Sequence, residues 1–274
     1  MNMSFGDALN QAIDQNNSLA CIGLDSDHRK LPTHLKDTSQ PQLEFNKAII
    51  DATGDLVCCF KANSAFYEAL GADGLEQLRL TIEYLHQKFP GIPMILDAKR
   101  ADIGNTNNGY IDYGFKYLGA DAITLHPYLG GEALQPFLDI KDKGMIVLCR
   151  TSNPGAAEFQ DLMVDGRPVY QHVAKTVKTW NKNKNCSLVV GATYPEEMKV
   201  IRELVGGDMV FLVPGIGAQG GDLESVMNAG LAGDRGLIIH SARQVIFASS
   251  SKDFASAARE QAVQLNQEIN KYRR

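Results

Sequence analysis

The chain has 274 residues, of which 44% are hydrophobic, and its formal net charge at pH 7 is -5. This length suits one large α/β domain or two small ones, and the negative charge argues against the basic surface that nucleic-acid-binding proteins present. No segment approaches the roughly 18 consecutive apolar residues of a membrane helix, and the first residues lack the regions of a signal peptide. We therefore expect a cytoplasmic protein that binds neither nucleic acid nor a membrane, with its five cysteines reduced and buried.

Short apolar runs, typical of buried strands, alternate with segments whose apolar residues recur at helical spacing. In chain order, the sequence predicts a helix at 5–15, a strand at 19–24, a helix at 41–53, a strand at 56–60, helices at 63–70 and 73–89, a strand at 93–96, a helix at 105–118, a strand at 122–125, a helix at 131–143, a strand at 145–149, a helix at 168–181, a strand at 188–190, a helix at 195–204, a strand at 209–213, a helix at 222–229, a strand at 237–239 and a helix at 254–270. Residues 155–167 show no clear periodicity, which is typical of a functional lid.

Eight strands that alternate with helices within about 250 residues are typical of a (β/α)8 TIM barrel. An open, doubly wound sheet is the alternative, because alternation alone does not show that the sheet closes. Polar residues follow the carboxyl end of every predicted strand, and in a barrel all those ends surround one site. We therefore expect a single barrel domain spanning residues 1–274, with its active site at the carboxyl ends of the strands.

Two carboxylates and an ammonium group follow the third predicted strand, as Asp97, Lys99 and Asp102. Side chains alternate along a strand, so Asp97 and Lys99 should point the same way, with Asp102 in the loop beyond. Lys61 and Asp25 end two neighbouring strands. One interpretation is a network of salt bridges that ties the barrel rim together. The other, which we favour, is a lysine held protonated among carboxylates, and therefore a general acid rather than a Schiff-base nucleophile.

The last two strands end in residues suited to phosphate. A glycine-rich turn at 215–221 leads into a predicted helix, and glycine lets backbone N–H groups approach an anion closely. Arg243 follows the eighth strand and can contact two phosphate oxygens at once. The alternative is a tight turn and an unrelated surface arginine. His126 and His240 also stand at strand ends, where we favour a structural role on the rim over a role in the site.

These residues resemble one enzyme family. Residues 97–103 (DAKRADI) and 214–221 (PGIGAQGG) are similar to motifs of orotidine 5′-phosphate decarboxylase. Residues 61–68 (KANSAFYE) and 150–155 (RTSNPG) resemble the longer bacterial subgroup of that family, apart from Ala62, where we would expect proline. The resemblance implies a dimeric barrel enzyme that converts orotidine monophosphate to uridine monophosphate and CO2, the last step of de novo pyrimidine nucleotide biosynthesis. It also implies that neither a metal nor an organic cofactor is used.

The resemblance further implies a role for individual residues. Lys99 would stabilise a C6 carbanion and then protonate it, with Asp97 facing the departing carboxylate. Asp102 would reach into the partner's site of a homodimer, with Ile103 and Thr106 beside it. Lys61, the fourth catalytic residue, would bind the ribose together with Asp25 and complete the row of alternating charges. The remaining substrate-binding residues serve the other parts of the nucleotide: Ser152 the pyrimidine edge, and Pro214, Gln219, Ala242 and Arg243 the phosphate-binding loops.

Two other classes of protein could account for part of this pattern. Related decarboxylases and aldolases of phosphosugars share the Asp-x-Lys-x-x-Asp strand but stabilise an enediolate with magnesium, which a glutamate on the second strand helps to bind. In this chain the position is Lys61, a poor ligand for a cation. A non-catalytic sensor of phosphate ligands would not need an intact cluster of Asp97, Lys99 and Asp102. Both alternatives are therefore disfavoured.

Overall fold

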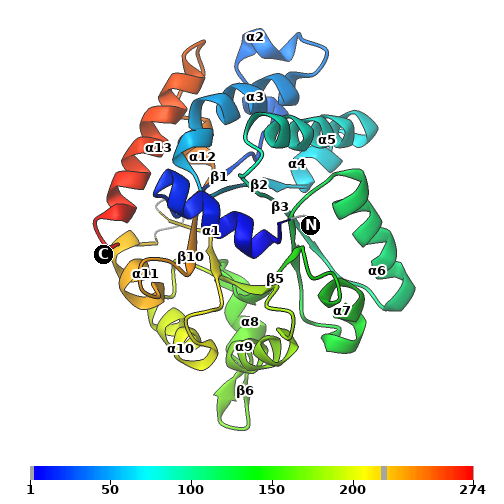
Figure 1. Ribbon diagram of the computed structural model, residues 1–274, viewed down its shortest axis with the longest axis vertical. Helices are drawn as coiled ribbons and strands as arrows, with labels where there is room; N and C mark the ends of the chain where they lie inside the picture. The colour runs from blue at the N-terminus through cyan, green and yellow to red at the C-terminus, as the bar shows by residue number, and fades with distance from the viewer. Residues whose placement is uncertain (1–2, 217–220, 274) are drawn as a thin grey trace.

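Within residues 3–216 and 221–273, which the computed structural model describes, eight parallel strands close into a barrel (Figure 1). The order around the barrel is β1-β10-β9-β8-β5-β4-β3-β2, and β1 pairs with both β2 and β10. The strands are β1 (Ala20–Gly23), β2 (Cys59–Asn63), β3 (Met94–Arg100), β4 (Ala122–Leu125), β5 (Gly144–Arg150), β8 (Cys186–Val190), β9 (Phe211–Val213) and β10 (Leu237–Ser241). The predicted TIM barrel is confirmed, and the open sheet is wrong.

Helices surround the barrel (Figure 1), and the longer ones bury an apolar stripe. In α5, for example, Leu78, Ile82 and Leu85 are fully buried. The helices are α1 (Phe5–Asn16), α2 (Thr33–Lys36), α3 (Pro41–Thr53), α4 (Ala65–Glu68), α5 (Gly71–Lys88), α6 (Gly104–Ile111), α7 (Gly130–Leu138), α8 (Ala157–Gln160), α9 (Val169–Trp180), α10 (Pro195–Val205), α11 (Leu223–Gly230), α12 (Arg243–Ile246) and α13 (Phe254–Asn270). Among the described residues, none of these helices is long and apolar enough to cross a bilayer.

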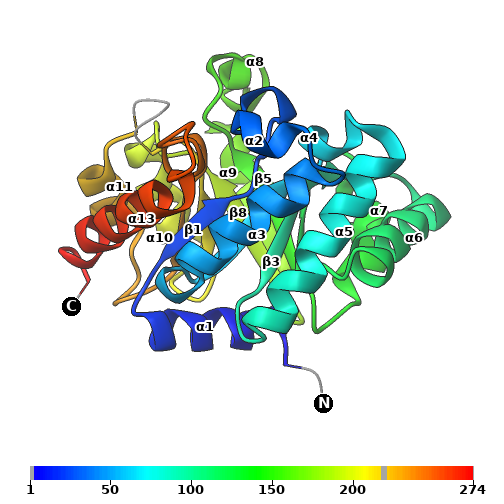
Figure 2. The same cartoon turned by 90° about the horizontal axis from the view of Figure 1, so that it is seen from above.

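Helix α1 closes the end of the barrel at which the strands begin. Its residues Phe5, Leu9 and Ile13 are buried, and the Phe5 backbone N–H donates to the carbonyl of Asp142, just before β5. Figure 2 shows α1 on one side of the molecule and both α2 and α8 on the opposite side. The carboxyl ends of the strands therefore remain as the end that can hold a site.

Four strands extend further at their carboxyl ends than their apolar runs predict: β5 by one residue, β10 by two, and the second and third strands by more. The second ends at Asn63 rather than at residue 60, and the third ends at Arg100 rather than at residue 96. Apart from Ala62 and Ala98, the extra residues in these two strands are polar or charged, so the hydrophobic pattern could not reveal them. In β3 the pairing with β4 shifts register between Leu96 and Arg100, and Lys99 has a left-handed backbone with φ of 47°. Positive φ is uncommon in non-glycine residues and occurs often at functional sites.

The segment predicted to lack regular structure contains several short elements. A 3-10 turn (Pro154–Ala156) leads into α8, and a small antiparallel hairpin follows, formed by β6 (Met163–Val164) and β7 (Arg167–Pro168). Each element is too short to give a periodic signal. Pro168, predicted as the first residue of a helix, instead ends β7 and immediately precedes α9. The predicted helix at 105–118 ends in a π-helical turn, Asp112–Tyr117. All five cysteines are buried and free, as predicted.

Candidate active site

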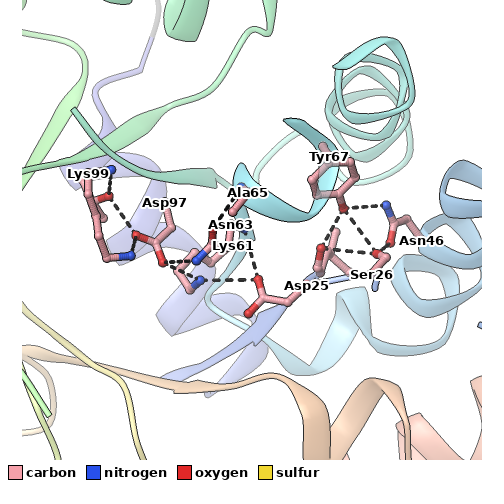
Figure 3. Close-up of polar contacts among 11 residues, drawn as sticks. Asp25, Ser26, Asn46, Lys61, Asn63, Ala65, Tyr67, Asp97 and Lys99 are labelled. Atoms are coloured by element: carbon pink, nitrogen blue, oxygen red, sulfur yellow. Dashed lines mark hydrogen bonds and ion pairs between the residues drawn. The ribbon is translucent and has the colours of Figure 1, made fainter. Parts of the chain in front are cut away.

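Four charged side chains of alternating sign form a row across the carboxyl ends of β1, β2 and β3 (Figure 3). Lys61 Nζ donates to Asp97 Oδ2 at 3.0 Å and lies 3.6 Å from Asp25 Oδ1. Lys99 Nζ donates to the other oxygen of Asp97, Oδ1, at 2.7 Å. Asp97 therefore binds an ammonium group on each of its carboxylate oxygens, and Lys61 lies between two carboxylates.

This arrangement fixes the charge of the two buried members of the row. Burial alone would raise the pKa of Asp97, but the attraction of Lys61 and Lys99 outweighs it and holds that pKa well below its usual range. Burial alone would lower the pKa of Lys61, but Asp25 and Asp97 outweigh it and raise that pKa above its usual range. Both groups are thus ionised at neutral pH, and their charges are fixed before any ligand binds.

Thr124 on β4 holds Asp97 and Lys99 together. Its hydroxyl donates to Asp97 Oδ1 at 2.9 Å and accepts from the Lys99 backbone N–H at 2.9 Å. The left-handed backbone of Lys99, rather than regular strand alternation, brings the ammonium back to Asp97. The Lys99 side chain is 48% exposed, whereas that of Lys61 is buried. Lys99 is therefore the ammonium group that a ligand can approach.

A buried hydrogen-bond network supports the loop that carries Asp25. The Tyr67 hydroxyl, fully buried, donates to the carbonyl of Leu24 at 2.6 Å. Asn46 donates to the Tyr67 hydroxyl at 2.9 Å and accepts from Ser26, the residue after Asp25 (Figure 3). Asp25 itself accepts from the backbone N–H of Asn63 at 3.1 Å. Because these polar groups satisfy one another, the loop is held rigidly beside Lys61.

The row borders a cavity of about 460 Å³. Lys61, Asp97 and Lys99 line one side, and Ser152 lies in the wall contributed by the segment after β5. A smaller cavity of about 120 Å³ adjoins it. Apart from Asp25, the residues that line the smaller cavity come from the loop after β9, from the end of β10 and from the residues that follow β10, and they include Gly215, Ser241, Ala242 and Arg243.

Three residues, Asp25, Pro214 and His240, line both cavities. The two spaces therefore lie next to each other, one beside a row of fixed charges and the other beside a guanidinium group and a glycine-containing loop. Such a pair can accept an elongated molecule that has a phosphate at one end and a ring at the other.

Three other predicted site residues, Asp102, Ile103 and Thr106, lie away from these cavities. Asp102 accepts from the Ile103 backbone N–H at 2.6 Å, and its own backbone is tied to Asn107. Ile103 and Thr106 are exposed, and within residues 3–216 and 221–273 none of the three lines either cavity. Gln219 lies outside the described residues.

Two residues that the sequence did not single out, Thr124 and Asn63, belong to the site or its walls, and so does His240, to which the sequence assigned a structural role. Thr124 binds Asp97, Asn63 donates to Asp97 Oδ2 at 3.4 Å, and His240 lines both cavities. Asn63 stands two positions after Lys61, so alternation along an extended strand could have revealed it. For His240, burial and the neighbouring Lys61 lower the pKa to about 3, so the ring is neutral at physiological pH. The sequence favoured a structural role for His240, but the structure shows that this ring lines both cavities.

The four charged side chains of the row do not resemble the ligands of a metal ion. Two of the four charged groups in the row are ammonium groups, which repel a cation. In the part of the chain that the structure describes, no group of three or more His, Cys, Asp or Glu side chains is placed to hold a metal ion. Independence from metals nevertheless remains a prediction that only an assay can test.

Similarity to known proteins identifies the family of this chain. A model of the orotidine 5′-phosphate decarboxylase / HUMPS family matches residues 18–260. The chain belongs to this family. It is 53% identical to orotidine 5′-phosphate decarboxylase from Cellvibrio japonicus over 98% of each chain, and 48% identical to that of Ralstonia pickettii over 99% of this chain and all of the other.

Solved structures agree with this assignment. The structure of OMP decarboxylase from Leishmania donovani is 38% identical, with a TM-score of 0.84 over 98% of this chain and 99% of that chain. A putative orotidine-monophosphate-decarboxylase from Toxoplasma gondii is 34% identical, with a TM-score of 0.86 over 98% of this chain and 99% of that chain. The family resemblance predicted from the sequence is therefore confirmed, and the chain is an enzyme of the carboxy-lyase class.

Proposed function

We propose that this enzyme decarboxylates orotidine 5′-monophosphate to uridine 5′-monophosphate and CO2, the last step of pyrimidine nucleotide biosynthesis, in the cytoplasm. The observation that carries the proposal is the exposed ammonium of Lys99, held 2.7 Å from the carboxylate of Asp97 at the edge of a cavity that adjoins a second, Arg243-lined cavity. Membership of the family and the names of the full-length relatives support the same substrate. All residues named come from one barrel, so we treat residues 1–274 as one functional domain.

In this mechanism the phosphate occupies the smaller cavity, beside Arg243 and the backbone near Ala242 and Pro214. Charge-assisted hydrogen bonds to a phosphate are strong, and they lie far from the reacting carbon. Their binding energy therefore serves to position the pyrimidine in the larger cavity. Ser152 then faces the pyrimidine edge, while Asp25 and Lys61 bind the ribose.

Loss of CO2 leaves an electron pair on C6 in an sp2 orbital that the ring does not delocalise. Preorganised charge must then provide most of the stabilisation. The Lys99 ammonium, already oriented by Asp97 and Thr124, lies beside the developing carbanion and then transfers a proton to C6, which yields the product and a neutral lysine. Solvent afterwards restores that proton.

Asp97 also faces the carboxylate that departs. Two unit charges 4 Å apart repel by about 4 kcal/mol at an effective dielectric constant of 20. Relief of such repulsion is contested as a source of rate enhancement, so we rank it below stabilisation of the carbanion by Lys99.

Asp102 acts in a second copy of the chain, in a homodimer. This proposal rests on its position: it follows the catalytic strand, it lines neither cavity of its own chain, and the neighbouring Ile103 and Thr106 are exposed. An exposed isoleucine beside a carboxylate suits a contact surface whose polar group enters the partner's site. There Asp102 would hold the catalytic lysine and a ribose hydroxyl.

Replacement of Lys99 by alanine tests the assignment. We expect Lys99→Ala to abolish the loss of orotidine monophosphate absorbance while circular dichroism and the unfolding curve stay close to those of the wild type. Lys116→Ala is the matched control, because Lys116 is an exposed lysine paired with Asp112 on the outside of the barrel. Activity near the wild-type level in Lys99→Ala would contradict the proposed proton donor.

A further inference from the structure

Arg150, the last residue of β5, is a charged side chain buried in the molecule. It is 1% exposed, although a guanidinium group is almost never fully buried without a partner. The mechanism above assigns it no role. A buried cation is tolerated only where other groups compensate its lost hydration, so its neighbours should reveal what it does.

Two aromatic rings and two side chains surround the guanidinium group. Its central carbon lies 3.7 Å from the ring centroid of Tyr194, after β8, and 5.8 Å from that of Tyr170 on α9. On its other side it donates to Asp161 Oδ2 at 3.2 Å and to Gln160 Oε1 at 3.3 Å. Arg150 thus joins the frame of the barrel to the segment that contains α8.

Gln160 extends this connection to the wall of the larger cavity. Its Oε1 also accepts from the Thr151 backbone N–H at 2.9 Å, and its Nε2 donates to the Thr151 hydroxyl at 2.8 Å. Thr151, Ser152 and Gln160 all line the cavity beside Lys99. The side chain that Arg150 binds is therefore itself part of the wall.

Apart from the buried side chain of Ala156 and the bonds of Gln160 to Thr151, few contacts hold the segment in place. Helix α8 has four residues, far fewer than an isolated helix needs to be stable in water. Phe159, within that helix, is 69% exposed, so the helix does not bury its largest apolar side chain. The carboxylate of Asp161 is 42% exposed and can separate from Arg150 without disturbing the barrel core.

We propose that Arg150 is a positioning residue that clamps residues 154–161 against the barrel through Gln160 and Asp161, and thereby builds the wall of the cavity in which the pyrimidine reacts. Tyr194 holds the guanidinium plane in the orientation that both contacts need. Lysine cannot replace arginine fully, because an ammonium group neither stacks on the ring in the same way nor offers a planar pair of donors.

Limited proteolysis measures the clamp directly, and this readout does not depend on the proposed function. Chymotrypsin cleaves after Phe159 only when the segment detaches, whereas Tyr128, 90% exposed in the loop after β4, provides an internal reference in the same digest. We expect cleavage after Phe159 to be about tenfold faster in Asp161→Asn, which corresponds to about 1.4 kcal/mol. Arg150→Lys should accelerate it at least as much, and Tyr194→Leu should accelerate it whereas Tyr194→Phe should not.

The matched control is Asp55→Asn, which breaks the pair of Asp55 with Arg259, two side chains about as exposed as Asp161. This variant should leave the cleavage rate after Phe159 unchanged. Cleavage within twofold of the wild-type rate in both Arg150→Lys and Asp161→Asn would overturn the clamp.

Substrate kinetics then test whether the clamped segment serves as the wall, and this step rests on the proposed function. In Arg150→Lys we expect KM for orotidine monophosphate to rise about tenfold, with kcat changed less than about twofold, because apparent affinity falls with the fraction of molecules whose wall is in place. An unchanged KM together with faster cleavage would overturn the role in the site. A wild-type protein without decarboxylase activity would overturn the proposed function, and the cleavage series would still decide the clamp.

Discussion

Lys61 offers a quantitative test of the charged row, because methionine replaces it at similar volume without its charge. Lys61 Nζ lies 3.0 Å from Asp97 and 3.6 Å from Asp25. At an effective dielectric constant of 20, each attraction is worth about 5 kcal/mol. Desolvation of the lysine offsets much of this gain, so the net loss for breaking a buried pair by removing one partner is about 3–5 kcal/mol. Lys99 and Thr124 still bind Asp97, which favours the lower end of that range.

The dependence on pH follows from the direction of each shift. The pKa of Asp97 is lowered by folding, so its contribution to stability is present above the usual aspartate pKa and is lost as pH falls toward the folded value. The pKa of Lys61 is raised by folding, so its contribution is present below the usual lysine pKa and is lost as pH rises through the folded value. The difference in stability between wild type and Lys61→Met should therefore be largest between about pH 5 and pH 10.

Urea unfolding followed by circular dichroism measures this difference. We expect Lys61→Met to lose about 3 kcal/mol at about pH 7.5 and clearly less at about pH 3, where the aspartates of the unfolded chain take up protons and the contribution of Asp97 is partly lost. Lys47→Met is the control, since Lys47 forms a 3.8 Å pair with Glu44 on an exposed helix surface and should cost less than about 1 kcal/mol. A loss below about 1 kcal/mol for Lys61→Met at about pH 7.5, or an equal loss at both pH values, would refute the reasoning.

Two further predictions concern the phosphate and the partner chain. Arg243→Met should raise KM for orotidine monophosphate by about tenfold to hundredfold, with a smaller change in kcat, because a charged hydrogen bond to the phosphate is worth about 1.5–3 kcal/mol. Inhibition by inorganic phosphate should weaken in parallel. Unchanged inhibition would show that Arg243 does not bind the phosphate. Mixing inactive Lys99→Ala with Asp102→Ala should restore up to about a quarter of the wild-type activity, since about half the dimers are hybrids and each hybrid has one complete site. No recovery, despite demonstrated subunit exchange, would contradict the role of Asp102 across the dimer.

The barrel could be predicted from the sequence because its signal is local. Each strand buries an apolar run, and the polar residue that ends the run marks the edge where the site lies. Asp25, Lys61 and Asp97 were identified in this way, and the structure places them in contact. The same local logic failed where strands continue through polar residues, as at Asn63, and where elements are as short as α8.

Other features of the site depend on residues far apart in the sequence. The left-handed backbone of Lys99 coincides with a register shift against β4, which no pattern within β3 reveals. Gly23 is needed because a Cβ there would lie 2.5 Å from His240 Nε2, a contact across more than 200 residues. Arg150 was visible in the motif at 150–155, but its burial depends on Tyr194. These contacts join residues that come together only when the barrel closes.

In the proposed mechanism, side-chain charges and no metal stabilise the carbanion that forms as CO2 departs. The most direct measurement is the loss of orotidine monophosphate absorbance in protein treated with EDTA and assayed without added metal. We expect the same rate as for untreated protein, and no increase when magnesium is added. Loss of activity in EDTA, restored by magnesium, would contradict the claim and assign the chemistry to a metal.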